Sequence, residues 1–407
     1  MEGWMPKTGN KRTEGRRSGA DCPKKGDLAL HYLDNAATTR VADAVADVAD
    51  AVLREHFANP SSLYAPGARS EALITDARET VAASLGARAG EIVFTASGSE
   101  GNNLAILGAV KARSAWADHI VVTGYEHPSV QNPIAALEKE GWRVTVVPPD
   151  ESGHVELQKL IDAAGPKTAL VAAMHVNNEI GSVLDVQALA RAVKEKNSRT
   201  AVHVDGVQAW GKTPIRLSET AIDSYTVSGH KIHAPKGVGA LYLRKGYHIA
   251  PVFSGGGQEA KRRPGTENIA YIAALAKAAE RLGHGVGARE KRIAALNALL
   301  WQRLEELPGI TRNSPPDARP ELANFSVDGI KSETMLHFLE SKGVYVSSGS
   351  ACSRGEASHT LTAMGLARRR IDTALRVSLC ADNSFDDVNA LVDALEAGIH
   401  TLAKMRR

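Results

Sequence analysis

The chain is poor in cysteine, carries little net charge and has no long apolar run. Three cysteines occur in 407 residues, at positions 22, 352 and 380. This scarcity argues against a disulfide framework and predicts a protein of the reducing cytoplasm. No apolar stretch approaches the roughly 18 residues that span a bilayer, so no membrane partner is expected. The net charge of +3 is too small to favour nucleic acid or lipid as the main partner.

Residues 1–28 differ from the remainder of the chain. They are basic and have almost no apolar content, so we expect a disordered tail. The segment lacks both the apolar stretch of a secretory signal and the amphipathic pattern of a transit peptide. A solvated tail is the favoured interpretation, and contact with nucleic acid is the alternative. The basic residues are Lys7, Lys11, Arg12, Arg16, Arg17, Lys24 and Lys25.

Helical and strand patterns alternate from position 41 onward, which predicts an α/β fold with a mainly parallel seven-stranded sheet. The last two strand patterns of this region are separated by too little chain for a crossover helix. We therefore expect them to add an antiparallel edge to the sheet. The strands are expected at 91–95, 119–123, 143–147, 169–175, 201–204, 224–227 and 239–243, and the helices at 41–57, 64–85, 99–113, 127–140 and 185–195.

The C-terminal part follows a different pattern and predicts a second, smaller α+β domain. Helical patterns over 267–307 are interrupted near 283–287, and we place the boundary within residues 284–290. The large domain is then expected over 41–286, and the small domain combines 29–40 with 287–407. Within the small domain, strands are expected at 324–327, 344–347 and 375–379, and helices at 332–342, 359–364 and 385–405.

Lys231 follows an apolar strand pattern in the motif Ser-Gly-His-Lys. Sites in α/β folds are built at the ends of strands, so this lysine is a candidate for chemistry. Desolvation and a neighbouring cation would lower its pKa and free the amine to form a Schiff base. A solvated surface lysine is the alternative.

Asp205 ends the apolar strand pattern 201–204. A carboxylate at this place packs poorly, but it can keep a pyridine nitrogen protonated and so maintain an electron sink. An N-cap for the following segment is the alternative interpretation. Gln208, three residues later, could donate a hydrogen bond to the phenolate oxygen of the same ring. An amine and a carboxylate of this kind predict pyridoxal-phosphate chemistry.

His127 and residues 95–100 occupy two further loops that follow strand patterns. The imidazole of His127 could stack on a flat ring or move a proton, and a satisfied loop histidine is the alternative. The run Thr-Ala-Ser-Gly-Ser-Glu at 95–100 offers backbone N–H groups at the start of a helix, which is a ready phosphate site. Simple capping, with Ser99 as the N-cap, is the other interpretation.

Cys352 lies in a Ser-, Gly- and Ala-rich segment without apolar periodicity, as is typical of a mobile loop. Structural cysteines lie among apolar neighbours, so an exposed one is a candidate nucleophile. Arg354 could hold its thiolate. Arg376 interrupts an apolar strand pattern and must be paired if it is buried. A fork for a substrate carboxylate and a structural ion pair are both open interpretations.

Together these motifs resemble the cysteine desulfurases, which belong to the class V aminotransferase group of pyridoxal-phosphate fold type I. The resemblance covers about residues 31–400. The Ser-Ser-Gly-Ser-Ala-Cys run at 347–352 is similar to that of the first desulfurase group, whose cysteine lies on a long loop. Further matching motifs are Tyr-Leu-Asp-Asn-Ala-Ala-Thr-Thr at 32–39, Asn-Pro-Ser-Ser at 59–62, His-Val-Asn-Asn-Glu-Ile-Gly at 175–181 and Arg-Pro-Gly-Thr at 263–266.

The resemblance implies a fold type I protein that binds pyridoxal 5′-phosphate, and it assigns roles to particular residues. The cofactor ring would be contacted by Lys231 through a Schiff base, Asp205 at the ring nitrogen, Gln208 at the phenolate and His127 by stacking. The phosphate would be held by Gly98, Ser99, Ser228, His230 and, from a second subunit, Thr266. The substrate would be oriented by Asn178 and Arg376, with Asn35 nearby.

The reaction and the partners are also implied by the resemblance. L-Cysteine would be converted to L-alanine, and its sulfur would pass to Cys352 as a persulfide. The contact made by Thr266 implies a homodimer with a shared active site. Sulfur would then be delivered to an acceptor protein or a tRNA-modifying enzyme, for iron–sulfur clusters or for thiolation.

The chain departs from the family pattern at several places. Ser99 stands where the family commonly has Thr, and its hydroxyl can serve the same purpose. The loop that follows Cys352 is two residues shorter than in many relatives, which leaves the sulfur acceptor open. Cys380 and Ala381 replace a Gly-Arg pair after the strand that contains Arg376, and the sequence offers no account of this change.

Two other functions fit the same residues. A selenocysteine lyase uses the same framework with a preference for selenium. A non-catalytic paralogue could act as a sulfur-relay scaffold, but retention of Lys231, Asp205, Gln208, His127 and Cys352 speaks against it.

Overall fold

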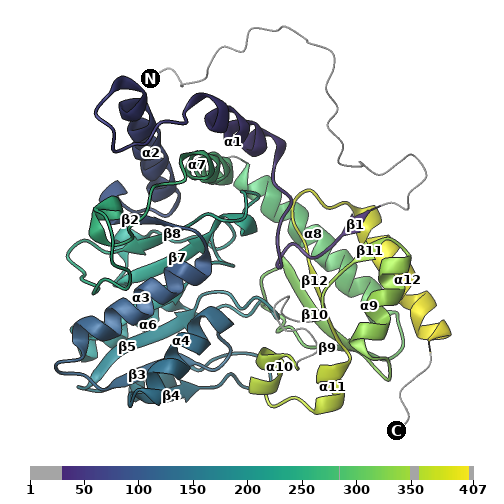
Figure 1. Ribbon diagram of the computed structural model, residues 1–407. Coiled ribbons are helices and arrows are strands. Elements are labelled where there is room, and N and C mark those ends of the chain that lie inside the picture. Colours follow the sequence, from purple (N-terminus) through teal and green to yellow (C-terminus); the bar gives the residue numbers. More distant parts are fainter. Residues whose placement is uncertain (1–29, 284, 349–356, 403–407) are drawn as a thin grey trace, which may run out of the picture.

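A seven-stranded sheet forms the centre of the larger part of the molecule (Figure 1). The computed structural model describes residues 30–283, 285–348 and 357–402. The strand order is β2-β8-β7-β6-β5-β3-β4. Adjacent strands from β7 to β4 are parallel, which confirms the predicted α/β class. The strands are β2 (Ile92–Thr95), β3 (His119–Thr123), β4 (Arg143–Val147), β5 (Thr168–Met174), β6 (Ala201–Asp205), β7 (Ser224–Ser228) and β8 (Gly239–Leu243).

Strand β8 is antiparallel to both of its neighbours, as the short connection from β7 requires. It does not form the edge of the sheet, so that part of the prediction was wrong. Strand β2, far earlier in the chain, pairs with the free side of β8 and takes the edge position. The short connection between β7 and β8 determined the direction of β8. The strand on the other side of β8 is set by a pairing with β2, which is distant in the sequence.

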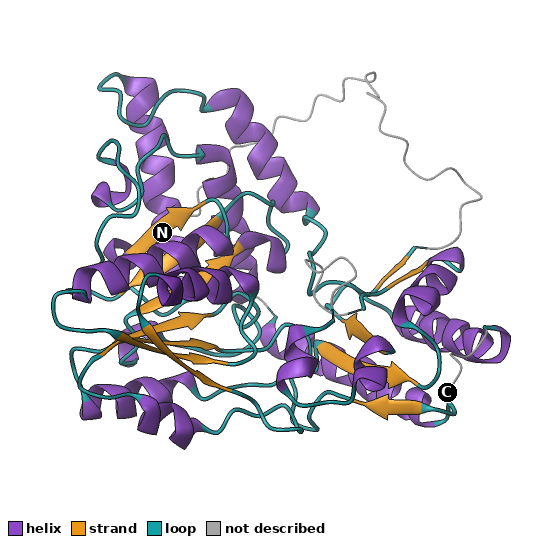
Figure 2. Cartoon of the chain, turned by 60° about the horizontal axis from the view of Figure 1, so that its bottom comes forward, coloured by secondary structure: helices purple, strands orange, loops and turns teal. Residues whose placement is uncertain are grey.

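Helices cover both faces of this sheet (Figures 1 and 2). Side chains alternate between the faces, so Ile120 and Val122 pack in one apolar cluster and Val121 in the other. Helices α3 and α4 belong to the first cluster, and α2, α5, α6 and α7 to the second, with α1 packed on α7. The helices are α1 (Asp43–Glu55), α2 (Ala65–Ser84), α3 (Gly98–Arg113), α4 (Pro128–Lys139), α5 (Leu157–Ala163), α6 (Val186–Lys196) and α7 (Ile269–Gly283).

A second apolar core lies around a smaller antiparallel sheet of order β12-β10-β9, centred on the buried Phe325. The residues before α1 join this part, because β1 (His31–Tyr32) pairs in parallel with β11 (Val344–Tyr345). The separate cores support the proposed two domains, although the boundary itself stays a prediction. The other elements are β9 (Ile310–Arg312), β10 (Leu322–Val327), β12 (Ala374–Ser378), α8 (Val286–Glu305), α9 (Ser332–Ser341), α10 (His359–Ala363), α11 (Arg368–Asp372) and α12 (Phe385–Thr401).

No helix within the described ranges is long and apolar enough to cross a membrane.

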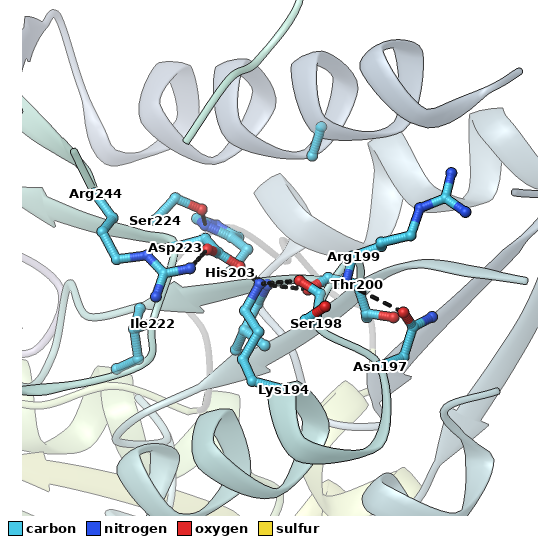
Figure 3. Close-up of polar contacts among 12 residues, drawn as sticks. Lys194, Asn197, Ser198, Arg199, Thr200, His203, Ile222, Asp223, Ser224 and Arg244 are labelled. Carbon is cyan, nitrogen blue, oxygen red and sulfur yellow. Dashed lines mark hydrogen bonds and ion pairs between the residues drawn. The ribbon is translucent and has the colours of Figure 1, made fainter. Parts of the chain in front are cut away.

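A buried carboxylate joins α6 to the strands of the large sheet (Figure 3). Asp223 immediately precedes β7, and its side chain is 1% exposed. It accepts a hydrogen bond from the backbone N–H of Val202 at 2.8 Å. Lys194 of α6 lies 2.5 Å from its Oδ2, and Arg244 pairs with its other oxygen. Two cations and a backbone donor therefore compensate the buried charge.

We expect Asp223→Asn to lower the free energy of unfolding by about 3 kcal/mol, because it leaves Lys194 partly buried without its carboxylate. Asp118→Asn is the matched control, since the Asp118–Arg143 pair is exposed on both sides. Its loss should cost less than about 1 kcal/mol. Denaturant unfolding of both variants measures the difference, and equal losses would contradict the importance of the buried pair.

Candidate active site

A cavity of about 260 Å³ opens at the carboxyl ends of the parallel strands, where α/β folds form their sites. Its wall combines the start of α3, the loop before α4, the last residues of β5, β6 and β7, and one side chain of β12. The lining residues are Ala36, Ala37, Ser97, Gly98, Ser99, Asn102, His127, Ser129, Met174, Asn178, Asp205, Val207, Gln208, Ser228, His230, Lys231 and Arg376.

Most of the residues predicted from the sequence line this cavity. Asn35 and Thr266 do not: each lines a different, neighbouring pocket. Cys352, with Arg354, lies outside the described residues, so its assignment stays a prediction. The predicted residues that the structure brings together are Gly98, Ser99, His127, Asn178, Asp205, Gln208, Ser228, His230, Lys231 and Arg376.

Lys231 ends a single 3₁₀ turn, Gly229–Lys231, that directly follows β7. Its side chain is partly buried, and its Nζ donates to the backbone carbonyls of Ala36 at 2.5 Å and Ala37 at 2.8 Å. The alternative of a solvated surface lysine is therefore wrong. The amine is held by the segment that precedes α1, on the wall of the cavity.

Asp205 is the last residue of β6 and is buried. One oxygen, Oδ1, accepts from the backbone N–H of Val207 at 3.0 Å. The other, Oδ2, accepts from the amide Nδ2 of Asn102 at 2.8 Å. Asp205 thus caps the segment that follows it and also lies on the cavity wall. The interpretation as a local cap and the interpretation as a cofactor ligand are therefore compatible.

Asn102 is a site residue that the sequence reasoning missed. It lies on α3 with no exposed surface, and it also donates to Ser129 Oγ at 2.9 Å. Its Oδ1 contacts Nε2 of His203 at 3.1 Å, and the other ring nitrogen of His203 contacts Ser224 Oγ at 2.9 Å. Burial lowers the pKa of His203 to about 3, so this chain of contacts holds Asp205 through neutral groups. The sequence feature that could have revealed Asn102 is a side-chain amide among the apolar residues of a helix, since a buried amide needs hydrogen-bond partners.

His127 is the N-cap of α4. The alternative interpretation, a loop histidine whose side chain is satisfied by local hydrogen bonds, is therefore correct as well. Its Nδ1 accepts from the backbone N–H of Ser129 at 3.1 Å. Nδ1 therefore keeps its lone pair, and the neutral ring carries its proton on Nε2. Burial is the main cause that lowers the pKa of His127, against the opposing effect of Asp205. The ring remains on the cavity wall as a neutral, planar group.

The start of α3 forms one end of the cavity. Ser97, and not Ser99, caps the helix: its hydroxyl accepts from the N–H of Glu100 at 3.1 Å. The capping role predicted for Ser99 was therefore wrong, and its hydroxyl is available to the cavity. A Cβ on Gly98 would lie 2.8 Å from Val207 Cγ2, so only glycine fits there. Backbone N–H groups at a helix start favour an anionic ligand.

Ser228 and His230 complete this end of the cavity. His230 contacts Thr38 Oγ1 at 3.3 Å. Burial, and next the charge of Lys231, lower the pKa of His230 to about 3. The imidazole is therefore neutral at physiological pH and can take part as a hydrogen-bonding group without adding a charge.

Arg376 of β12 is 1% exposed and reaches the cavity from the smaller core. Its Nη2 pairs with Asp34 at 2.7 Å, and its Nη1 donates to the backbone carbonyl of Asn178 at 3.2 Å. The structural ion pair foreseen as one interpretation is present. Nε is buried without a hydrogen-bond partner among the described residues, so the guanidinium is not fully used. Its role toward a substrate carboxylate stays a prediction.

Gln208 contacts the segment that precedes α1 and a half-buried lysine. Its Nε2 donates to the carbonyl of Ala36 at 2.9 Å. Its Oε1 accepts from Lys212 Nζ at 3.1 Å. These contacts fix which end of the amide faces Ala36, and they place the Nε2 donor beside the Lys231 amine, which bonds the same carbonyl.

Comparison with known proteins identifies the family. A model of class-V aminotransferases matches residues 31–391. The chain is 39% identical over 372 residues to a cysteine desulfurase of Nostoc sp., covering 90% of this chain and 92% of that protein. Among solved structures, a NifS-like protein is 35% identical with a TM-score of 0.87, over 91% of this chain and 99% of that one. SspA in complex with cysteine is 32% identical with a TM-score of 0.77, over 87% and 99%.

The chain therefore belongs to the class-V aminotransferase family and, within it, to the cysteine desulfurases. Enzymes of this family depend on pyridoxal phosphate. The family, the fold class and the enzyme class predicted from the sequence are confirmed. The roles of individual residues are not tested by these comparisons.

Glu126, next to His127, is a buried acid whose pKa is raised to about 8, first by burial and then by the charge of Asp205. The hydroxyl of Thr123 donates to one carboxyl oxygen, and the other lacks a hydrogen-bond partner within the described ranges. At neutral pH the folded protein therefore holds a protonated carboxyl next to a residue that lines the cavity.

Glu126→Gln should flatten the pH dependence of stability. The folded pKa of Glu126 lies above its ordinary value of 4.5, so between these values the folded state binds more protons than the unfolded state. Stability is then lost as pH rises from about 4.5 to about 8, by at most ~1.4 kcal/mol per pH unit. Denaturant unfolding across this range should show the slope difference, which the exposed Glu138→Gln should not produce. Parallel curves for wild type and Glu126→Gln would contradict the assignment.

Proposed function

We propose that this chain binds pyridoxal 5′-phosphate in the 260 Å³ cavity and acts as a cysteine desulfurase. L-Cysteine and the Cys352 thiol would give L-alanine and a Cys352 persulfide, so the sulfur moves without any further oxidant or reductant. The observation that carries the proposal is that one cavity gathers the amine of Lys231, the carboxylate of Asp205 and the start of α3. The cysteine bound in the related SspA structure supports the choice of substrate.

The residues present fit the cofactor. A cationic amine, a buried carboxylate and a neutral planar imidazole share the cavity, and its far end has a helix start where a Cβ at Gly98 would not fit. When bound, the cofactor withdraws electrons from the α-carbon of an attached amino acid. It would be held by Lys231 at the aldehyde carbon, Asp205 at the ring nitrogen, Gln208 at the phenolate, His127 on the ring face, and Gly98, Ser99, Ser228 and His230 at the phosphate.

The remaining groups would orient the substrate and move protons. Asn178 and Arg376 lie on the side of the cavity that faces the smaller core, and they would bind the substrate carboxylate. The amine of Lys231, once released, would be placed to carry a proton at the α-carbon. Cys352 would approach from its own segment and accept the sulfur, after which an acceptor protein or a tRNA-modifying enzyme would collect it.

A homodimer would complete the phosphate site through Thr266. This residue lies outside the cavity of its own chain, in a pocket with Ala96 and Arg263. Large apolar side chains are exposed between α1 and α2, including Phe57 at 83% and Leu63 at 103%. Exposed apolar groups of this size favour a protein interface. They support a second copy of this chain as the partner.

Borohydride reduction of the cofactor-loaded protein should fix the cofactor on Lys231. Peptide mapping should find the label at this residue, and Lys231→Ala should lose both the label and alanine formation. Lys212→Met is the matched control, because Lys212 is a half-buried lysine that bonds Gln208. Label at Lys212, or at no lysine, would contradict the proposed site.

Cys352→Ser should retain the cofactor yet release alanine from L-cysteine more slowly, by on the order of 10³-fold. The reason is that the hydroxyl cannot accept sulfur as a persulfide. Mass spectrometry of the protein after reaction should find the added sulfur in wild type and in Cys22→Ser, but not in Cys352→Ser. A persulfide formed normally in Cys352→Ser, at Cys22 or Cys380, would contradict the assignment.

A further inference from the structure

A second cavity, of about 140 Å³, lies on the other side of Lys231 from the cofactor cavity. Lys231 and Ala36 line both. Its wall includes Cys380, the residue that departs from the family pattern and that the desulfurase reaction does not use. His233, two residues after Lys231, and Asp382, two residues after Cys380, line the same cavity.

We propose that His233, Cys380 and Asp382 form a binding site for a divalent transition-metal ion of the zinc class. One potential ligand atom from each residue lies within 4.8 Å of the others. Nδ1 of His233 is 3.8 Å from Oδ2 of Asp382. In a tetrahedral zinc site the ligand atoms are about 3.5 Å apart. A shift of about 1 Å therefore suffices, and Asp382 can provide it because its side chain is 79% exposed.

The donor set determines the kind of metal. A thiolate, an imidazole and a carboxylate suit zinc, cobalt and related ions, whereas magnesium and calcium prefer oxygen ligands alone. Three protein ligands leave a fourth position for water, and the cavity beside them has room for it. The two anionic ligands also balance the charge of a divalent ion. Lys212 and Arg281 face His233 and oppose the cation.

The backbone holds both halves of the site in place before any metal arrives. His233 has a φ of 67°, in the left-handed region, and its N–H donates to Thr39 Oγ1 at 2.8 Å. Its Nδ1 also contacts the carbonyl of Arg40 at 3.0 Å, and binding a metal through this nitrogen would replace that contact. On the other side, the N–H of Cys380 donates to Asn383 Oδ1 at 2.9 Å.

The site would join the two cores of the molecule. His233 follows the lysine turn of the large sheet, and the Cys380–Asp382 turn follows β12 of the smaller core. A metal bound by both would connect the Lys231 segment to the smaller core, and it would stabilise the folded protein because the unfolded chain separates the ligands.

The test uses the full-length, cofactor-loaded protein with Cys352→Ser, so that Cys22 and Cys380 are the only thiols left. Titration with Co²⁺ should show one bound equivalent, with visible ligand-field bands and a near-ultraviolet thiolate-to-cobalt band. Adding Cys380→Ser should abolish the thiolate band. Zn²⁺ should compete for the same equivalent and raise the Tm, and this shift should disappear with Cys380→Ser.

His233→Asn and Asp382→Asn are the companion variants. Asn tolerates the left-handed backbone at position 233, and position 382 is exposed, so both proteins should fold. Each should weaken Co²⁺ binding by about 10-fold or more, since even changes beyond the direct ligands cost that much. A thiolate band that persists with Cys380→Ser would overturn the proposal. So would the absence of a bound equivalent, or unchanged affinity in both Asn variants. These readouts do not depend on desulfurase activity.

Discussion

The parallel register of β5, β6 and β7 is the constraint on which the site depends. Met174 is paired with Asp205, and Asp205 with Thr226, so the strands end together at one edge of the sheet. The loops that follow therefore start from a common line, and each delivers functional side chains to the same cavity. Residues from distant parts of the sequence meet because their strands are neighbours, and the two packed helical layers keep those strands in place.

Burial controls the charges around this edge. Desolvation lowers the pKa values of His127, His203 and His230 and raises that of Glu126. Each group is thereby held in its neutral form at physiological pH. Asp205 lies among these neutral groups and is held by an amide and a backbone N–H. The cavity can thus offer a carboxylate at one place and an amine at another without a network of competing ions.

Local patterns predicted the strands and helices well, and failed where the signal was short or non-local. Strands β3, β4 and β8 have the predicted bounds because each is a short run rich in apolar residues with clear breaks at both ends. The five- to seven-residue helices α5 and α11, and the strands β1 and β9, are too short to show a period. The position of β8 inside the sheet required its pairing with β2. Likewise, only the folded structure distinguishes Ser97 from Ser99 as the cap, because both hydroxyls lie close to the helix start.

The sequence by itself determined the family, the α/β class, and ten residues that line one cavity. Local chemistry marks those at strand ends and helix starts, and the motifs shared with the family mark the rest. The tertiary structure alone decided what those residues touch. It showed Arg376 paired with Asp34, Asn102 holding Asp205, and Thr266 away from its own chain's cavity. It also brought His233 beside Cys380 and Asp382. Such contacts join segments far apart in the chain, and no local periodicity carries information about which of them will pack together.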